Sequence, residues 1–172
     1  MFRFLMVFAL APLTIALVDF LVLLPLGLAL HEGVRTFLSR RDYHEMLDII
    51  TGIGVILIAW GVALEERHEL RDIFNIHSHD EELQLTIDQG CKATGIGALV
   101  LGLFAEMCIE AIKLPNHILN TEGINEILVG VSLVLIALTA YVLIRHIVLL
   151  GPAIWRRRLP ASTHSRSRPS SL

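Results

Sequence analysis

The chain has 172 residues, of which 54% are hydrophobic and 18% charged, and its formal net charge at pH 7 is -3. Soluble domains are typically about 45–50% apolar and about 25% charged, and a chain of this length cannot bury such an apolar excess in its own core. The composition therefore excludes an ordinary soluble domain. Because the apolar residues come in long unbroken runs, it predicts an all-α polytopic integral membrane protein.

The first predicted span covers residues 4–30, and Asp19 is its only ionisable residue. Because Arg3 precedes this apolar run, a cleaved signal peptide is the competing interpretation. The apolar core of a signal peptide is only about 7–15 residues long, and this run is much longer. We therefore predict an uncleaved helix, in which Pro12 and Pro25 can introduce the kinks that helices in lipid tolerate.

Two further predicted spans, 47–65 and 126–146, are conventional apolar segments. The remaining predicted span, 93–113, is different, because it carries two acidic residues. It reaches the roughly 20 residues that a spanning helix needs only if Glu106 and Glu110 enter the membrane with it. The prediction of four spans therefore depends on how these two glutamates are accommodated.

These segments form one membrane domain, residues 1–155, which we expect to be a four-transmembrane-helix bundle with short extramembrane helices. Residues 156–172 are rich in Arg and Ser and are expected to form a disordered basic tail. Lys and Arg are enriched on the cytoplasmic side of membrane proteins, and most of them share one side of these spans. We predict a multi-pass protein of a bacterial-type inner cell membrane with both termini cytoplasmic, although Arg35, Arg40 and Arg41 fall on the other side.

The longest predicted loop lies between the second and third spans, and its residues 77–82 have the side chains of a metal site. We interpret this segment instead as the start of a helix, because Ser78 and Glu81 have the spacing of a capping box. Gly90 is the expected end of that helix. Residues 65–71 are expected to extend the second span into water.

Glycines recur at related places in the predicted spans, and the sequence TGIG occurs in both the second and the third. A helix duplication and the small residue repertoire of membrane helices are two explanations that the sequence leaves open. In either case, small residues let helix backbones approach closely in lipid. We therefore expect helix contacts at the glycines of the spans, namely Gly52, Gly54, Gly61, Gly95, Gly97, Gly102 and Gly130.

Three carboxylates, Asp19, Glu106 and Glu110, are predicted to lie inside the membrane, where an ionisable residue suggests a functional site. Counted from the inner ends of their spans, Asp19 and Glu106 are expected at similar depth, with Glu110 one helical turn further out. Neighbouring carboxylates in a low dielectric must share protons or a cation, and no Lys or Arg is expected at that depth. These acids therefore predict a polar track for protons or metal cations.

The alternative is that the same acids are structural. Asp19 would then be protonated and hydrogen-bonded to a backbone carbonyl or to a threonine, of which Thr14, Thr51 and Thr94 are the candidates. The two glutamates would instead face a cation of a partner subunit.

On the outer side, His31 and Glu32 close the first span, and His44 and Glu45 open the second. Imidazole and carboxylate ligands together suit Zn, Fe, Mn or Ni, so these four residues are the candidate metal ligands. The sequence identifies no cofactor, and a divalent metal is the candidate that these ligands leave open. Haem is a weaker alternative, because it needs histidines paired across helices at one depth. No histidine is expected in the interior of a span, and only His68 and His146 share a level, at the inner ends of their helices.

The chain lacks a Gly-rich phosphate loop and a nucleophile elbow, and its eight histidines do not form the close boxes of membrane oxygenases. We therefore expect neither an enzyme nor nucleic-acid binding. The expected function is that of a non-catalytic accessory subunit or assembly component, embedded in the lipid bilayer within a larger membrane complex. The alternative is ion transport, by a homo-oligomeric transporter or channel that moves protons or metal cations along the intramembrane carboxylates.

Overall fold

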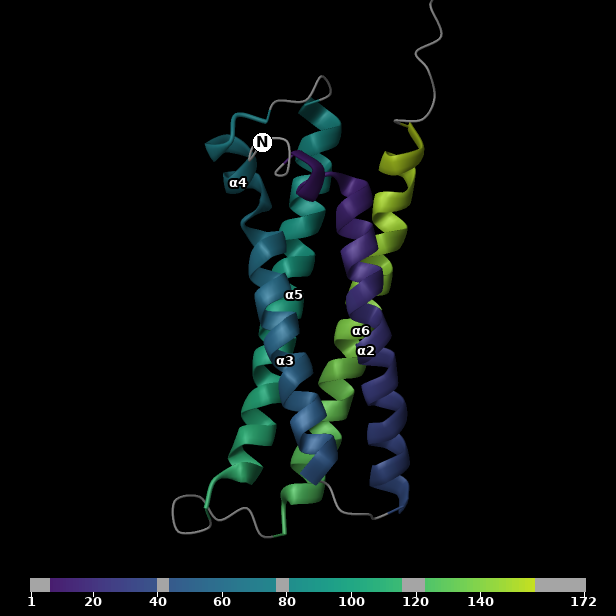
Figure 1. Cartoon of the computed structure of the whole chain (residues 1–172), viewed down its shortest axis with the longest axis vertical. Coiled ribbons are helices and arrows are strands. Elements are labelled where there is room, and N and C mark those ends of the chain that lie inside the picture. The colour runs from purple at the N-terminus through teal and green to yellow at the C-terminus, as the bar shows by residue number, and fades with distance from the viewer. Residues whose placement is uncertain (1–6, 40–43, 77–80, 116–122, 157–172) are drawn as a thin grey trace, which may run out of the picture.

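A computed structural model of the chain describes residues 7–39, 44–76, 81–115 and 123–156, without the side chains of His44, Ala153 and Arg156. This part of the chain contains helices and no strand. The helices, in order, are α2 (Pro12–Ser39), α3 (His44–Glu65), α4 (Arg67–Ile73), α5 (Glu81–Lys113) and α6 (Asn125–Arg156) (Figure 1). The predicted all-α fold, with long apolar helices and a short additional helix, is confirmed.

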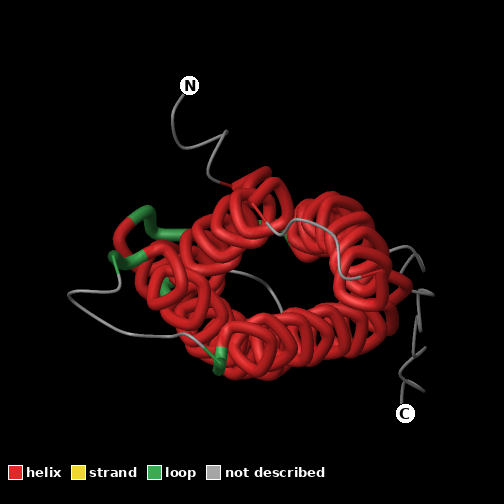
Figure 2. The backbone as a smooth tube through the Cα atoms, turned by 90° about the horizontal axis from the view of Figure 1, so that it is seen from below, coloured by secondary structure: helices red, strands yellow, loops and turns green. Residues whose placement is uncertain are grey.

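The four long helices form a ring in the order α2, α3, α5, α6, so that each packs against two neighbours (Figure 2). The largest interface joins α3 to α5, and the smallest joins α2 to α3. We call one end of the bundle the α4 end, because α4 lies there, together with the starts of α2 and α5 and the ends of α3 and α6 (Figure 1). The other end is called the Lys113 end.

Four helices, spanning 12–39, 45–65, 81–113 and 125–152, are long and apolar enough to cross a membrane. In the most apolar part of each, only 28% to 39% of the residues are buried inside the bundle. The remaining apolar side chains point outward, where water would solvate them poorly and lipid would solvate them well. The helices are therefore those of a multi-pass membrane protein.

The first helix differs in position from the predicted span 4–30, since α2 begins at Pro12 and continues to Ser39. Proline suits the first position of a helix, because its missing N–H would have no partner within the helix there. Pro25 lies inside α2 without ending it.

The third long helix begins at Glu81, well before the predicted span 93–113, and runs without a break to Lys113. The expectation that a separate helix ends at Gly90 is therefore wrong. A glycine inside a helix is unfavourable by about 1 kcal/mol relative to alanine. The stripe of buried residues that includes Ile87 and Cys91 continues across this position, and packing of that stripe outweighs the penalty. Ser78 lies outside the described residues.

Glycines hold α3 and α5 close together. A Cβ atom on Gly61 would lie 2.7 Å from the carbonyl oxygen of Gly95, and one on Gly95 would lie 2.5 Å from that of Gly61. Gly102 and Gly54 make similarly close approaches further along the same pair of helices, to Leu57 and to the side chain of Glu106. The backbones of α3 and α5 thus come together as the small-residue pattern predicts.

Other expected glycine contacts are looser or missing. Hypothetical Cβ atoms on Gly97 and Gly130 would reach Val142 and Phe37 only at ordinary van der Waals distances. Gly52 faces open space, with nothing within 4 Å, so it takes no part in helix contact in this bundle.

Candidate functional site

The most completely buried acid of the described helices, Asp19, lies at the centre of a hydrogen-bonded group with Trp60 and His146, which we call the Asp19 cluster. Asp19 is 0% and His146 1% exposed. The indole Nε1–H of Trp60 donates to Asp19 Oδ1 at 2.7 Å, and His146 Nδ1 lies 2.7 Å from Asp19 Oδ2. The cluster joins three helices, α2, α3 and α6.

Helical periodicity places Asp19 and His146 on the inner faces of their helices. Asp19 lies four residues after the buried Ile15, and His146 lies four residues before the buried Leu150. Residues separated by three or four positions share one face of a helix. Both polar side chains therefore point inward for the same reason as their apolar neighbours.

This arrangement satisfies both oxygens of the Asp19 carboxyl group. An indole N–H can only donate, so Oδ1 accepts its hydrogen bond. One proton lies between Oδ2 and the imidazole Nδ1 and makes the second hydrogen bond. Burying a polar or charged group without such partners is strongly unfavourable. The partners are a tryptophan and a histidine of the same chain, so the predicted bond to a threonine or a backbone carbonyl is corrected. Thr14 and Thr51 instead bond to the carbonyls of Phe8 and Leu47.

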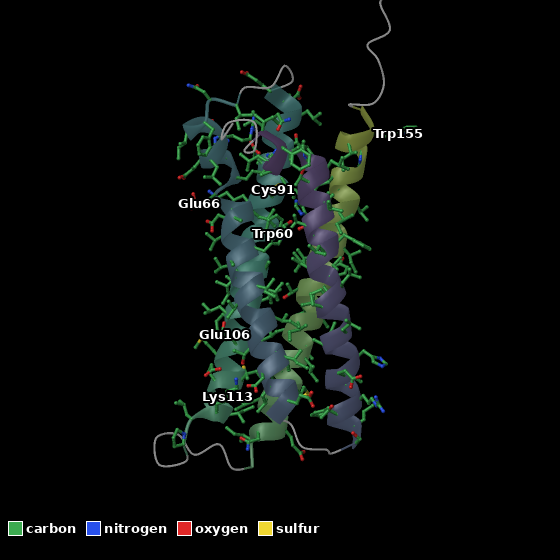
Figure 3. The ribbon with its side chains drawn as sticks, viewed as in Figure 1. Trp60, Glu66, Cys91, Glu106, Lys113 and Trp155 are labelled. Carbon is green, nitrogen blue, oxygen red and sulfur yellow. The ribbon has the colours of Figure 1, made fainter. Side chains whose placement is uncertain are left out.

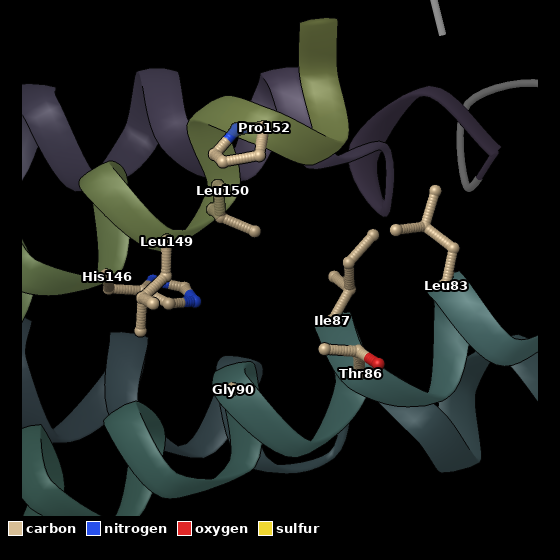
Figure 4. A pocket seen from close by; sticks show the side chains of 8 residues that line it. All are labelled: Leu83, Thr86, Ile87, Gly90, His146, Leu149, Leu150 and Pro152. Atoms are coloured by element: carbon tan, nitrogen blue, oxygen red, sulfur yellow. The ribbon is translucent and has the colours of Figure 1, made fainter. Parts of the chain in front are cut away.

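The second ring nitrogen of His146 has a different environment. Nε2 is buried and has no hydrogen-bond partner in the part of the chain that the structure describes. The His146 side chain belongs to the lining of a cavity between α5 and α6 (Figure 4). The expectation that no histidine lies in the interior of a span is therefore wrong, because His146 is buried within α6.

Glu106 and Glu110 lie away from the Asp19 cluster. Figure 3 shows Trp60 nearer the α4 end and Glu106 nearer the Lys113 end. The two acids contact different levels of α3, since Asp19 bonds to Trp60 and Glu106 packs against Gly54. Trp60 and Gly54 are six residues apart on α3, which is about 9 Å at 1.5 Å per residue. The expected equal depth of Asp19 and Glu106 is wrong, because α2 and α5 begin at Pro12 and Glu81 rather than at the predicted ends of the spans.

Glu110 belongs to a second group, the Lys113 cluster, made by Asp48, Thr51, Glu110 and Lys113. Lys113 Nζ lies 3.1 Å from Asp48 Oδ1 and 3.4 Å from Glu110 Oε1, and it donates to Thr51 Oγ1 at 2.9 Å. The Glu110 side chain is 51% exposed. A cation of the same helix therefore lies beside Glu110, which corrects the expectation that no Lys or Arg would be near.

A third group, the Asp88 cluster, contains Arg67, His68, Arg71, Gln84 and Asp88. Arg67 and Asp88 are 2% and 7% exposed and form an ion pair. Arg71 Nη1 lies 2.5 Å from the other carboxylate oxygen of Asp88, and His68 Nδ1 lies 3.4 Å from it. Arg67 also donates to Gln84 Oε1, at 3.4 Å.

The Asp88 cluster joins α4 to α5 and to the residues before α2, since Arg67 also donates to the carbonyl oxygen of Leu10 at 2.9 Å. The expectation that residues 65–71 extend the second span into water is wrong for Arg67. One signal could have revealed the site. Arg67 and Arg71 are one helical turn apart, as are Gln84 and Asp88, so each pair presents a single face.

The predicted metal ligands at the Lys113 end are spread out. His31 and Glu32 are exposed on α2, and Glu32 Oε1 lies 3.7 Å from Arg35 Nη1. Glu45 is exposed at the start of α3, and the side chain of His44 lies outside the described residues. Within the described ranges, no group of three or more His, Cys, Asp or Glu side chains could hold a metal ion.

The Asp19, Lys113 and Asp88 clusters are the groups of interacting polar side chains that we single out in the described helices. No family model, curated protein or solved structure matches this chain. The residues of the three clusters and the cavity beside His146 are therefore the features from which a function can be inferred.

Proposed function

We propose that this chain is a non-catalytic component of a bacterial-type inner membrane, acting as an accessory or assembly subunit of a larger membrane complex. The observation that supports this most directly is the closure of the Asp19 cluster. Both oxygens of the most deeply buried carboxyl group are used by Trp60 and His146 within the chain. An acid that holds three helices together is a structural element, and both oxygens of Asp19 already have partners within the chain.

The other polar clusters fit the same proposal. The Asp88 cluster ties α4 against the bundle with buried ion pairs, and the Lys113 cluster lies at the opposite end. These groups are separate from one another rather than joined along the bundle. Under this proposal, the outward-facing apolar side chains meet lipid and the apolar surfaces of other membrane subunits.

The orientation is part of the proposal. Arg67 and Arg71 lie on α4, and Lys92 and Arg145 lie in the halves of α5 and α6 that are nearer the α4 end. Since Lys and Arg mark the cytoplasmic side, we propose that this end faces the cytoplasm, with both termini inside.

Purification of the tagged chain from its native membrane, at its native level, tests the proposal. We expect a complex with a fixed stoichiometry of other subunits, and a lower level of those subunits when the chain is deleted. A chain that purifies alone, and whose deletion changes the level of no other membrane protein, would contradict an accessory role.

Proton or metal-cation transport is the second candidate, and the Asp19–His146 pair is the observation in its favour. A carboxyl group and an imidazole 2.7 Å apart can exchange a proton inside the bundle. Under this candidate, Asp19→Asn abolishes cation or proton flux in proteoliposomes, and Glu106→Gln does so if that residue lies on the route. Glu126→Gln, at an exposed acid in the first turn of α6, is the matched control. Unchanged flux in all three variants would exclude transport through these acids.

A further inference from the structure

The cavity beside His146 has a volume of about 260 Å³ and lies between the first part of α5 and the last part of α6 (Figure 4). Its walls are almost entirely apolar, formed by side chains such as Leu83, Ile87 and Leu150. Two backbone features make room for it. Gly90 has open space where a Cβ atom would be, and Pro152 interrupts the hydrogen bonding of α6. The cavity therefore follows from the sequence of both helices.

One polar atom stands out in this apolar lining. His146 Nε2 is buried and has no partner among the described residues, and Figure 4 shows the ring among the residues that surround the cavity. Thr86 is the other lining side chain with a polar atom, and its hydroxyl donates to the carbonyl oxygen of Glu82 at 3.1 Å. A ligand in the cavity would therefore find one free hydrogen-bonding site, on the imidazole.

The Asp19 cluster controls what that nitrogen can do. When the Asp19 carboxyl group is ionised, His146 Nδ1 must donate to it. Nε2 then carries a lone pair if the ring is neutral, and a proton if the ring is charged. It can accept a hydrogen bond from a hydroxyl group or donate one to a carbonyl group, while the indole of Trp60 holds the carboxyl group in place.

We propose that this cavity binds a neutral, membrane-soluble compound of the quinone class, with its ring in the cavity and one ring oxygen on His146 Nε2. The apolar walls disfavour an ion, and an acyl chain alone would leave Nε2 without a partner. The volume is slightly below the roughly 300–1,000 Å³ of small-molecule sites, which suits a single ring better than a haem macrocycle.

Access from the bilayer supports this class of ligand. Leu149, on the rim of the cavity, is 56% exposed on the outside of the bundle. A ring can therefore enter from the lipid, and its apolar tail can remain there. Binding at this cavity does not depend on whether the chain is an accessory subunit or a transporter, so the two proposals can fail separately.

Tryptophan fluorescence tests the proposal directly, because the chain has two tryptophans and one of them is in the Asp19 cluster. In a Trp155→Phe background, Trp60 is the sole emitter. A short-tailed benzoquinone, titrated into the full chain in lipid nanodiscs, is expected to quench this emission along a saturable curve. Quenching that rises linearly up to the solubility limit of the quinone would overturn the proposal.

Two variants locate the site. Gly90→Leu fills the cavity without touching a hydrogen bond, and it should weaken quinone binding at least about tenfold. Gly52→Leu is the matched control, since it makes the same change in a helix at a position that faces open space, and it should leave binding unchanged. If Gly90→Leu shows saturable quenching with the same midpoint as the Trp155→Phe parent, the cavity is not the site.

The role of the imidazole is tested by His146→Asn, which keeps an N–H donor near Asp19 and removes Nε2. A lost hydrogen bond of ordinary strength corresponds to about tenfold weaker binding.

A parallel titration with brominated phosphatidylcholine distinguishes an acyl chain as the occupant. If the brominated chains quench Trp60 in a manner that Gly90→Leu abolishes, while the quinone shows no saturation, the cavity is a lipid site and the proposal is wrong.

Discussion

The Asp19 cluster and the Lys113 cluster each contain an acid of an apolar helix, yet these acids differ in burial and in the source of their partners. Asp19 is buried, and its partners come from two other helices. Glu110 is half exposed, and its nearest cation is three residues away on the same helix. An acid in an apolar helix therefore does not by itself mark an ion pathway. The helices that supply its partners determine whether it holds the bundle together or lies at its surface.

The Asp88 cluster extends this comparison and provides the largest expected effect. Asp88→Ala removes the carboxylate that pairs with the buried Arg67, and it should lower the free energy of unfolding by about 3–5 kcal/mol. Glu110→Ala at the exposed cluster should lower it by at most about 1 kcal/mol. Urea-induced unfolding in one detergent measures both values. Equal losses in the two variants would remove the distinction between buried and exposed clusters.

Trp60→Phe tests how far the Asp19 cluster stabilises the bundle. The change removes the indole donor and leaves Asp19 Oδ1 buried without that partner. Leaving a buried acceptor without its partner costs about 1–3 kcal/mol, and we expect a loss of that size in the same unfolding experiment. Trp155→Phe, at a 71% exposed tryptophan of α6, serves as the control and should have little effect.

Gly61→Ala and Gly52→Ala should change stability in opposite directions. The new methyl group at Gly61 would meet the backbone of α5 and separate the helices, with a loss of about 1–3 kcal/mol. At Gly52 nothing lies within 4 Å, and the better helix propensity of alanine should stabilise by up to about 1 kcal/mol. Thermal unfolding of both variants, read by circular dichroism, gives the two signs. A stabilising Gly61→Ala would contradict the close helix contact.

The smallest effect is expected at Glu66, an exposed acid between α3 and α4. The negative charge of Glu69 raises the pKa of Glu66 above its ordinary value of 4.5, because it disfavours a second charge nearby. Since the folded state raises this pKa, its contribution to stability is largest below pH 4.5 and declines as pH rises through the shifted value. Carboxyl-carbon NMR titration of Glu66 should show the raised pKa, and Glu69→Gln should bring it back. An unchanged midpoint would show that Glu69 is not the cause.

Much of the fold follows from local sequence signals. Long apolar runs identify the four spanning helices, and the glycines at 61 and 95 mark the closest approach of α3 and α5. These properties depend on composition and helical periodicity, which a single segment carries by itself. The predicted start of α5 is wrong because glycine alone favours a helix end at Gly90. The buried residues on either side of it, such as Ile87 and Cys91, pack against the bundle and keep the helix continuous.

The partners of Asp19 could not be predicted in the same way. Trp60 and His146 are 41 and 127 positions away in the sequence, and the helix order in the ring brings them together. The inward face of each helix can be read from periodicity, but the pairing of faces depends on how the helices surround one another. Arg67 illustrates the same difficulty, since a charged segment after a span resembles a solvated helix until Asp88 is placed beside it.

The distance in sequence between Asp19 and His146 has a consequence for how this protein is made. Synthesis proceeds from the N-terminus, so α2 reaches the membrane before α3 exists, and long before the histidine of α6 is available. An aspartate at the centre of a spanning helix disfavours insertion by about 2.5–3.5 kcal/mol, and Asp19, the eighth residue of α2, carries a smaller penalty of the same sign because it lies nearer one end. The first helix therefore completes its stable insertion late, when α6 arrives, and truncated chains that end before His146 should be retained at the insertion machinery or degraded.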